Sequence, residues 1–225
     1  MRILITAAEE EELITAKQAY NSLTPGEKSE LTVTYMLTGI GSVSTSYRLT
    51  KILNSTPESF DLVVNIGIAG SFAQEFPVGS VARVEKEYFG DLGFETLFGF
   101  ETLFDYNILD ADTFPYKGGA LHAVELSAEI EKIMAVYKHA AAVTVQTVSG
   151  LPEKTLQLKR DFRPQIESME GAAFFYVCLL EKVPFIELRS VSNEVGERNR
   201  KNWNIPLALD SLTEANKCLL KSLLA

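Results

Sequence analysis

The sequence predicts an α/β fold, in which the strands of one sheet alternate along the chain with helices. Short apolar runs of strand length, such as 62–67, end in glycine-rich turns, and segments with helical spacing of apolar residues follow most of them. The length of 225 residues and the 46% share of hydrophobic residues are enough to bury a sheet. No linker composition interrupts the chain, so we expect a single domain spanning 1–225.

The N-terminal part alternates strand and helix patterns. Acids at the start of the first helix lie at the positive end of its dipole, which stabilises it. Thr24-Pro25-Gly26 is expected to break that helix, and Ser42 is expected to cap the next one. The small residues at 67–71 are expected to form a loop after their strand. The expected elements are a strand at 2–7, a helix at 9–22, a strand at 31–37, a helix from 42 to about 53, and strands at 62–67 and 81–87.

A duplicated hexapeptide marks the segment 90–116. The residues GFETLF at 93–98 are repeated at once at 99–104. One tandem copy is too short for a solenoid, so we expect an irregular flap or an interface loop. Exposed phenylalanines there need to be covered by substrate or by a second subunit. We therefore expect a homo-oligomer, a dimer or larger.

The C-terminal part continues the alternation. Pro152 suits the first turn of a helix, where its missing N–H is not needed. Ile166 leads into the Ser168-Met169-Glu170 segment, from which a further helix begins. The expected elements are a helix at 126–137, a strand at 142–148, a helix at 152–162, a helix from Glu170 to Leu180, a strand at 184–191 and a closing helix from near Pro206 to Leu224.

Composition excludes several classes of function. The net charge is −9 and no basic patch is apparent, which disfavours nucleic-acid binding. No apolar run has membrane-spanning length and the N-terminus lacks a signal-peptide pattern, so we expect a cytoplasmic protein without membrane contact. The two cysteines and two histidines show no metal-ligand spacing, and we expect no metal and no cofactor.

Two glutamates are candidates for chemistry. Glu170 is a lone acid in an apolar setting at a helix start, where the hydroxyls of a ribose would give its carboxylate hydrogen-bond partners. Glu12 is the last of four consecutive acids after the first strand, where an acid activates water and repels phosphate. The alternative for each is an acid that only stabilises a helix dipole.

Polar and glycine residues at other strand ends complete the candidate site. Ser192-Asn193 follows a strand, and ligands of α/β sheets collect at the carboxyl ends of strands. An asparagine amide both donates and accepts, which suits a purine with a 6-oxo group, although a turn asparagine is the simpler interpretation. Because glycines let the backbone approach a ligand closely, we expect substrate contacts at Thr38, Gly39, Ile40 and Gly67.

The order of these motifs resembles that of the nucleoside phosphorylase/hydrolase superfamily over nearly the whole chain. The N-terminal acids, the Thr-Gly-Ile-Gly turn, the Gly-Ile-Ala-Gly loop and Met169-Glu170-Gly171-Ala172 are similar to the methylthioadenosine/S-adenosylhomocysteine nucleosidase branch. That resemblance implies a three-layer α-β-α fold with a central mixed, twisted sheet. It also implies that Glu12 activates water and that Glu170, beside Met169, binds ribose.

One departure from that branch concerns the leaving base. Where the branch has Ser-Asp this chain has Ser192-Asn193, and the loss of the acid puts an adenine leaving group in doubt. The segment 192–209 and Phe89-Gly90-Asp91-Leu92-Gly93 are similar to futalosine hydrolases. The resemblance implies cleavage of futalosine into hypoxanthine and dehypoxanthine futalosine, in menaquinone biosynthesis. Arg198 and Arg200 are then candidates to bind the aryl carboxylate of the substrate, because guanidinium pairs bidentately with carboxylate.

Three alternatives stay open from the sequence. A methylthioadenosine/S-adenosylhomocysteine nucleosidase shares most of the motifs. A purine nucleoside phosphorylase tolerates Asn193 but needs a cationic phosphate pocket, whereas the N-terminal turn offers acids. A non-catalytic nucleoside-binding protein keeps Glu170 without needing Glu12. The expected partner in each case is a small purine nucleoside.

Overall fold

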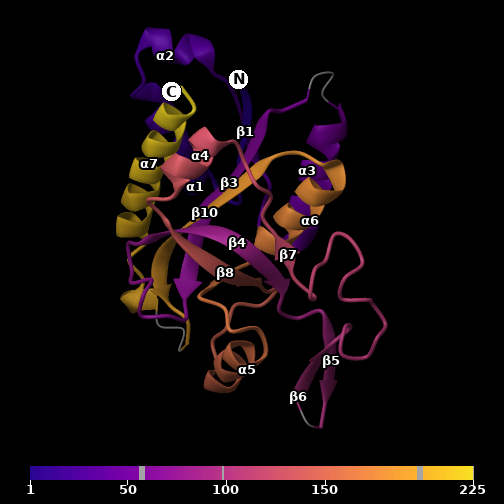
Figure 1. Ribbon diagram of the computed structural model, residues 1–225. Helices are drawn as coiled ribbons and strands as arrows, with labels where there is room; N and C mark the ends of the chain where they lie inside the picture. Colours follow the sequence, from indigo (N-terminus) through magenta and orange to yellow (C-terminus); the bar gives the residue numbers. More distant parts are fainter. Residues whose placement is uncertain (56–58, 98, 197–199, 225) are drawn as a thin grey trace.

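The computed structural model describes residues 1–55, 59–97, 99–196 and 200–224, with the side chain of Arg200 left aside (Figure 1). The strands are β1 (Arg2–Ala7), β2 (Thr32–Leu37), β3 (Leu62–Ser71), β4 (Val81–Phe89), β5 (Gly93–Thr96), β6 (Gly99–Thr102), β7 (Leu121–His122), β8 (Lys138–Thr144), β9 (Ile166–Ser168) and β10 (Phe185–Glu194). The helices are α1 (Glu10–Asn21), α2 (Pro25–Glu30), α3 (Ser42–Ser55), α4 (Ala128–Met134), α5 (Pro152–Phe162), α6 (Gly171–Glu181), the 3-10 turn η1 (Arg200–Asn202) and α7 (Ile205–Ser222).

The main sheet is mixed and partly closed on itself. β10 pairs in parallel with β3 and antiparallel with β4, while β9 pairs in parallel with β8 and antiparallel with β3. With the parallel pair β4 and β8, these five strands close into a ring. β1 and β2 extend the sheet from β3 as parallel strands. The closure brings the carboxyl ends of β1, β3, β9 and β10 together, and that edge holds the candidate site.

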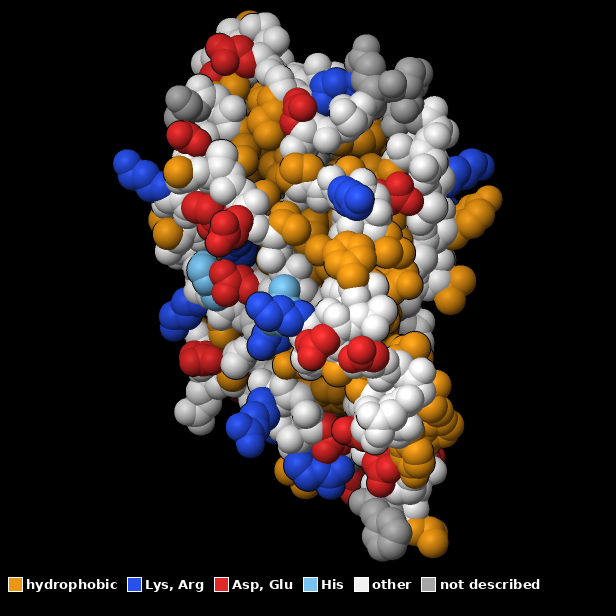
Figure 2. Space-filling view, turned by 45° about the vertical axis from the view of Figure 1, so that its right-hand side comes forward, with side chains coloured by type: hydrophobic (Ala, Val, Ile, Leu, Met, Phe, Trp, Pro, Cys, Tyr) orange, Lys and Arg blue, Asp and Glu red, His pale blue; other side chains and the backbone are white. Residues whose placement is uncertain are grey.

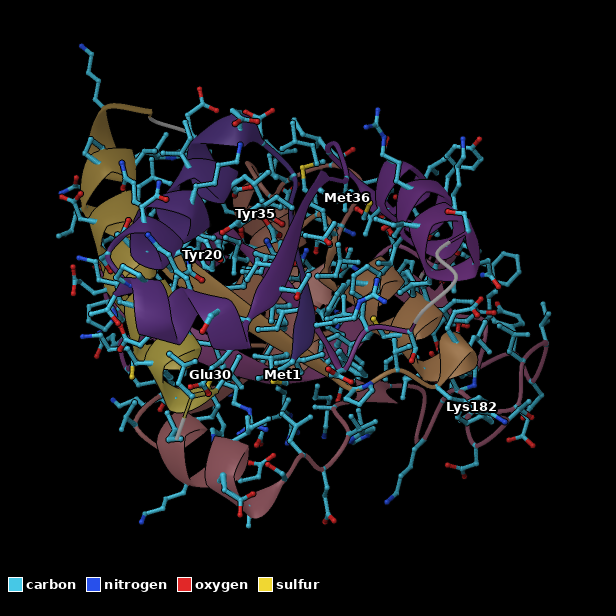
Figure 3. The ribbon with its side chains drawn as sticks, turned by 90° about the horizontal axis from the view of Figure 1, so that it is seen from above. Met1, Tyr20, Glu30, Tyr35, Met36 and Lys182 are labelled. Atoms are coloured by element: carbon cyan, nitrogen blue, oxygen red, sulfur yellow. The ribbon has the colours of Figure 1, made fainter. Side chains whose placement is uncertain are left out.

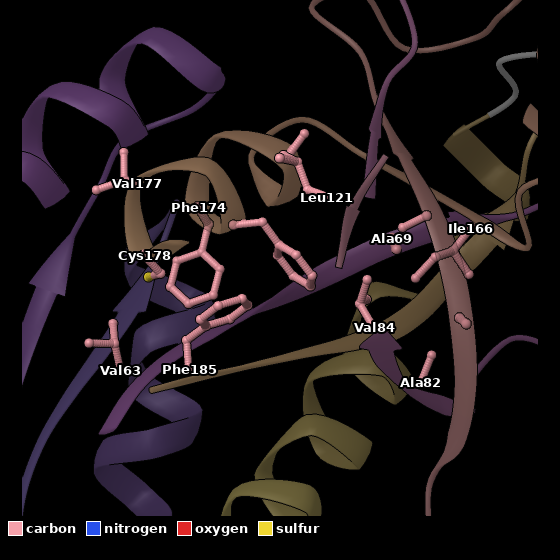
Figure 4. Packing of buried hydrophobic residues seen from close by; sticks show 14 of the residues in the cluster. Val63, Ala69, Ala82, Val84, Leu121, Ile166, Phe174, Val177, Cys178 and Phe185 are labelled. Carbon is pink, nitrogen blue, oxygen red and sulfur yellow. The ribbon is translucent and has the colours of Figure 1, made fainter. Parts of the chain in front are cut away.

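Helices cover both faces of the sheet, which confirms the predicted three-layer α/β fold. α1, α4 and α7 lie on one face, and α3 and α6 lie on the other (Figure 1). On the α6 face, Phe174 packs edge-on against Phe185 of β10 with ring centroids 5.6 Å apart, beside Cys178 and Val63 (Figure 4). Burial of such side chains contributes about 1.5–3 kcal/mol each, so this layer fixes the start of α6 firmly against the sheet.

The edge strand β2 shows the alternation that the sequence predicts. Tyr35 lies on the side of α1 and Tyr20, and Met36 lies on the side of α3 (Figure 3). Successive side chains of a strand point to opposite faces, so each helical layer receives every second residue.

One of the two local predictions about turns is wrong. The loop expected at 67–71 is the second half of β3, because β10 pairs with Ile68 to Ser71 and β9 pairs with Gly70 and Ser71. Tertiary pairing outweighs the local preference of small residues for a turn. The first helix ends at Asn21, before Thr24-Pro25-Gly26, as predicted. These residues also begin α2, where the Thr24 side chain accepts a hydrogen bond from the Glu27 N–H and Pro25 occupies the first turn.

The duplicated hexapeptide is more regular than predicted. The two GFET segments form β5 and β6, which pair antiparallel from Gly93 with Thr102 to Thr96 with Gly99. Figure 2 shows apolar side chains on the visible face of the molecule, including its lower end, where the hairpin of β5 and β6 lies. In this hairpin region the Leu97 side chain is 100% exposed and the Phe94 side chain is 40% exposed. Their covering by a second subunit stays a prediction.

Other boundaries shift by a few residues. The strand expected at 142–148 runs over Lys138–Thr144, because it pairs with β4 from its first residue. The helix expected at 126–137 is limited to Ala128–Met134, capped by the Ser127 side chain. Among the described residues, no helix combines the length and apolar character that crossing a membrane requires.

Candidate active site

A cavity of about 590 Å³ opens at the carboxyl ends of β1, β3, β9 and β10. This volume lies in the range of small-molecule sites. Its polar residues include five glutamates, and its described lining contains no lysine or arginine. The lining residues are Ala8, Glu9, Glu12, Ile40, Ile68, Ala69, Gly70, Val148, Ser149, Glu167, Ser168, Met169, Glu170, Ser192, Asn193, Glu194, Val195, Gly196, Trp203, Ile205 and Pro206.

Glu12 lies on the cavity wall in the first turn of α1 and is 7% exposed. Its Oε1 accepts a hydrogen bond from the Ile68 N–H at 2.9 Å, and its Oε2 accepts from the Ala8 and Glu9 N–H groups at 3.1 Å each. Burial raises the pKa of Glu12, and the Arg189 guanidinium and these N–H donors oppose that rise. A carboxylate held in one orientation with a raised pKa is suited to accept a proton from water.

Glu170 is also on the cavity wall, at the N-cap of α6, and is 6% exposed. Its Oε1 accepts the Gly41 N–H at 2.9 Å, although the two residues are 129 positions apart. Gly41 donates from a turn in which its φ is +86°, a conformation that glycine adopts without strain. The turn between β2 and α3 therefore fixes the carboxylate that the sequence assigns to ribose.

Arg189 of β10 lies behind both glutamates and is 1% exposed. Its Nε donates to Glu187 at 2.6 Å, its Nη2 donates to Asn65 at 2.5 Å, and its Nη1 lies 3.8 Å from Glu170 Oε2. Burial alone would lower the pKa of Arg189, but the carboxylates of Glu187, Glu170 and Glu12 raise it above the ordinary value. A permanent positive charge thus stands behind the acids of the cavity.

Ser192 and Asn193 lie near the end of β10 and line the cavity. The Ser192 hydroxyl donates to Asn193 Oδ1 at 2.8 Å, and Asn193 Nδ2 donates to the Glu194 carbonyl at 2.9 Å. These two bonds orient the amide with its donor and its acceptor assigned. Oδ1 keeps a second lone pair, and Nδ2 has a second N–H for a bound base.

The remaining predicted residues divide between the wall and the layer behind it. Ile40 and Met169 line the cavity. Thr38 is buried with its hydroxyl directed to the Ala7 carbonyl, and Gly39 follows it in the turn. Gly67 lies beneath the cavity, where a Cβ would collide with the Arg189 guanidinium. Substrate contact by these residues stays a prediction.

Two predicted arginines are not placed by the structure. Arg198 lies outside the described residues, and Arg200 is described only as the first residue of η1. Their role with a substrate carboxylate stays a prediction. Among the described residues, no group of three or more His, Cys, Asp or Glu side chains has the arrangement of a metal site.

The structure adds residues that sequence reasoning missed. Arg189 lies inside the strand expected at 184–191, and Glu167 directly precedes the Ser168-Met169-Glu170 segment, so no motif marks either residue. A charged residue inside an apolar strand is rarely buried without a partner, and this pattern in the sequence around Arg189 indicates a buried ion pair. Trp203 and Val195 add apolar surface to the cavity.

Comparison with known proteins gives the family. Residues 4–225 match the family model of the Phosphorylase superfamily. The chain belongs to this superfamily. The futalosine hydrolase of Thermus thermophilus is 32% identical over 189 residues, which cover 83% of this chain and 80% of that protein. The predicted resemblance to futalosine hydrolases within the superfamily is confirmed.

Other members of the superfamily are named as nucleosidases. The 5'-methylthioadenosine/S-adenosylhomocysteine nucleosidase of Maridesulfovibrio salexigens is 28% identical over 222 residues, 88% of this chain and 87% of that protein. The crystal structure of such a nucleosidase from Colwellia psychrerythraea, in complex with adenine, superposes with a TM-score of 0.76 at 22% identity, over 99% of this chain and 96% of that one. It supports the fold. Since the relatives are named hydrolases or nucleosidases, the predicted N-glycosyl hydrolase class is confirmed.

Proposed function

We propose that this protein hydrolyses the N-ribosidic bond of futalosine, releasing hypoxanthine and dehypoxanthine futalosine, and that it does so in menaquinone biosynthesis. The observation that carries the proposal is the Ser192-Asn193 pair on the cavity wall, with its amide oriented by hydrogen bonds on both sides. The identity of 32% to the futalosine hydrolase of Thermus thermophilus supports it.

The proposed chemistry assigns one task to each polar group. Departure of the base leaves positive charge on the ribose ring, and the Glu170 carboxylate stabilises that charge while it binds the hydroxyls. Glu12 accepts a proton from the attacking water. Asn193 donates from Nδ2 to the 6-oxo group, and its Oδ1 accepts a hydrogen bond from the protonated N7 of the leaving base.

The charge of the cavity favours water over phosphate as the second reactant. Glu12 and Glu170 face the space that the nucleophile must enter, and no lysine or arginine lines it within the described residues. A phosphate dianion there would meet two carboxylates without a cation on the wall. Hydrolysis is therefore the proposed reaction rather than phosphorolysis.

A second substrate class has support of its own. The superfamily members named as 5'-methylthioadenosine/S-adenosylhomocysteine nucleosidases cover up to 91% of this chain at 26–29% identity. Hydrolysis of methylthioadenosine is therefore the alternative function, with the same roles for Glu12 and Glu170.

The test is a comparison of substrates under identical conditions. Futalosine, inosine and methylthioadenosine are incubated with the enzyme, with and without phosphate, and the released base and sugar are identified by chromatography. We expect hypoxanthine from futalosine as the fastest reaction, at a rate independent of phosphate. A preference for methylthioadenosine would overturn the substrate, a ribose 1-phosphate product would overturn the reaction, and binding without turnover would indicate a nucleoside-binding protein.

A further inference from the structure

The turn that leads from β2 into α3 contacts Glu170 through its backbone. Gly41 donates its N–H to Glu170 Oε1 at 2.9 Å, and the neighbouring Ile40 lines the cavity. Gly39 and Gly41 have φ angles of +75° and +86°. Glycine restricts the backbone less than any other residue, so the geometry of this turn depends on contacts made by its neighbours. Whatever holds the turn therefore also holds the carboxylate of Glu170.

Gln146 lies against this turn from outside the cavity. It follows the end of β8, is exposed, and is not among the residues that line the cavity. Its Nε2 donates to Ser42 Oγ at 2.7 Å. Its Oε1 lies over Gly41, where a Cβ would be 3.4 Å away. One side-chain amide therefore contacts two consecutive residues at the point where the turn enters α3.

Ser42 connects Gln146 to the backbone beside Glu170. The Ser42 hydroxyl accepts the hydrogen bond of Gln146 and donates to the Met169 carbonyl at 3.4 Å. A hydroxyl has one hydrogen and two lone pairs, so both bonds form at the same time. The amide of Gln146 is thus linked to Glu170 by two routes, through the Gly41 N–H and through the residue that precedes Glu170 in the chain.

Asp91 fixes the backbone of Gln146 from the end of the neighbouring strand β4. The Gln146 N–H donates to Asp91 Oδ2 at 2.6 Å, and the Gly90 N–H donates to the Thr144 carbonyl at 2.8 Å. A hydrogen bond to a carboxylate is roughly twice as strong as one between neutral groups. Asp91 belongs to the segment 89–93, which is similar to futalosine hydrolases and has no task in the proposed chemistry.

We propose that Gln146 is a positioning residue, which holds the turn 39–41 so that Glu170 keeps the orientation that ribose binding requires. This inference rests on the proposed function, since it concerns the group that binds the ribose of that substrate. Gln146 acts through the turn and not on the substrate, because it lies outside the cavity lining. A displacement of about 1 Å in a catalytic group can cost about 10²-fold in rate, so hydrogen bonds behind the turn affect turnover.

The first test removes the amide. Gln146→Ala should lower kcat/KM for futalosine by about fivefold to tenfold, because the turn loses its contact from β8. Ser42→Ala removes the same hydrogen bond from the other side and should give a loss of similar size. The matched control is Gln18→Ala, which removes an exposed glutamine amide from α1 and should leave kcat/KM unchanged. Circular dichroism and thermal unfolding show that each variant is folded.

A double-mutant cycle separates positioning of Glu170 from a general loss of structure. In the Glu170→Ala background the group to be positioned is absent, so adding Gln146→Ala should change kcat/KM by less than about twofold. If Gln146 only stabilised the fold, the two losses would multiply, and that result would overturn the proposal.

Asp91 allows a rescue by a conservative change. Asp91→Asn keeps an oxygen that accepts the Gln146 N–H and should retain kcat/KM within about twofold of the wild type. Asp91→Ala removes the acceptor and should reproduce the loss seen in Gln146→Ala. Equal activities of the two Asp91 variants would show that the bond to Gln146 does not act on the site.

The outcomes distinguish this inference from the proposed function. A wild type that splits futalosine while Gln146→Ala keeps the full kcat/KM overturns the role of Gln146 alone. A wild type that splits methylthioadenosine instead overturns the proposed substrate, and the same cycle with Glu170→Ala is then measured on the ribose of that nucleoside. If no nucleoside is split, the cycle is measured on the dissociation constant of futalosine by calorimetry, with the same two results for and against Gln146.

Discussion

Two pairs of buried glutamates surround the Arg189 guanidinium, and only one of the two pairs lines the cavity. Glu12 and Glu170, the pocket pair, line the cavity and are 7% and 6% exposed. Glu87 and Glu187, the inner pair, are fully buried and lie outside the cavity lining. All four acids are held in a low-dielectric setting near one positive charge. Burial by itself therefore does not mark the acids that meet a substrate.

The hydrogen bonds of the two pairs differ as well. Backbone N–H groups hold Glu12 on both oxygens and Glu170 on one. In the inner pair, Glu87 Oε2 accepts from the Thr144 hydroxyl and Glu187 Oε1 accepts from Arg189. Glu87 Oε1 and Glu187 Oε2 have no hydrogen-bond partner among the described residues.

The inner carboxylates are also close to each other. A Cβ on Gly171 would collide with Glu87 and would lie 2.7 Å from Glu187 Oε1. Burial, followed by repulsion from Glu187, raises the pKa of Glu87 well above its ordinary value. Backbone donors therefore hold the pocket pair as hydrogen-bond acceptors, whereas burial and mutual repulsion favour the protonated form of Glu87 in the inner pair.

The largest expected effect is on the pocket pair. Glu12→Gln should lower kcat by about 10²-fold or more, because an amide cannot accept the proton of water. The fold should be retained, since the amide oxygen still accepts backbone N–H bonds. Turnover and melting temperature are measured together, with Glu11→Gln as the exposed neighbouring control. Near-wild-type turnover would remove Glu12 from the mechanism.

The pH profile sharpens this assignment. Water activation needs ionised Glu12, and burial raises the pKa of this residue above 4.5. Activity should therefore fall as the pH decreases through a value higher than 4.5. The residual activity of Glu12→Gln should lack this limb. An unchanged acid limb in the variant would assign it to another group.

Glu170→Ala should have the next largest effect. The variant loses both the ribose hydrogen bonds and the charge that faces the sugar, and a charge-assisted hydrogen bond contributes roughly 1.5–3 kcal/mol. A loss of about 10- to 100-fold in kcat/KM is expected. Steady-state kinetics and thermal unfolding decide the outcome. A lowered melting temperature with intact kinetics would assign Glu170 to the same structural class as the inner pair.

Asn193→Asp should change substrate preference rather than remove activity. An acid suits a 6-amino purine, so the ratio of kcat/KM for methylthioadenosine to that for futalosine should rise by about 1–3 kcal/mol in transition-state free energy. Competition assays with both substrates measure the ratio. If the ratio does not move, Asn193 does not read the base.

The smallest effect is expected from the inner pair. Glu87→Gln removes an acid whose pKa is raised in the folded state. Below pH 4.5 the carboxyl is protonated in both the folded and the unfolded wild type, so its ionisation does not lower the free energy of unfolding. The free energy of unfolding falls as the pH rises from there through the raised pKa. The variant should therefore gain about 1 kcal/mol over the wild type at pH near 8, or about 2–4 °C in melting temperature, and nothing below pH near 4.

Catalysis gives the complementary readout for Glu87→Gln. Since the inner pair does not reach the cavity, kcat/KM should stay within about twofold of the wild type. A gain in melting temperature that is the same at every pH would refute the raised pKa of Glu87. A large loss of kcat/KM would show that the inner pair acts on the site through Arg189.

The sequence alone determined the elements that local pattern controls. Apolar runs and their spacing predict β1, β2, α3, α5, α6 and α7 within a few residues, and the motifs predict Glu12 and Glu170 as site residues. Both acids face the cavity because each follows a strand whose carboxyl end lies at the same edge of the sheet. Asn193 was predicted for the same reason.

Only the tertiary structure decided the features that join distant segments. Gly41 and Glu170, which are 129 positions apart, form a hydrogen bond. Pairing with β9 and β10 makes the residues at 68–71 part of β3, although they locally favour a turn. Glu167 lies at the cavity because β9 pairs with β3 at Gly70. The burial of Arg189 among acids from different elements is likewise invisible along the chain. The local sequence pattern indicates which face of a helix or strand is apolar. The register and closure of the sheet depend instead on pairings between strands that are remote in the sequence. These pairings decide which polar groups share a site.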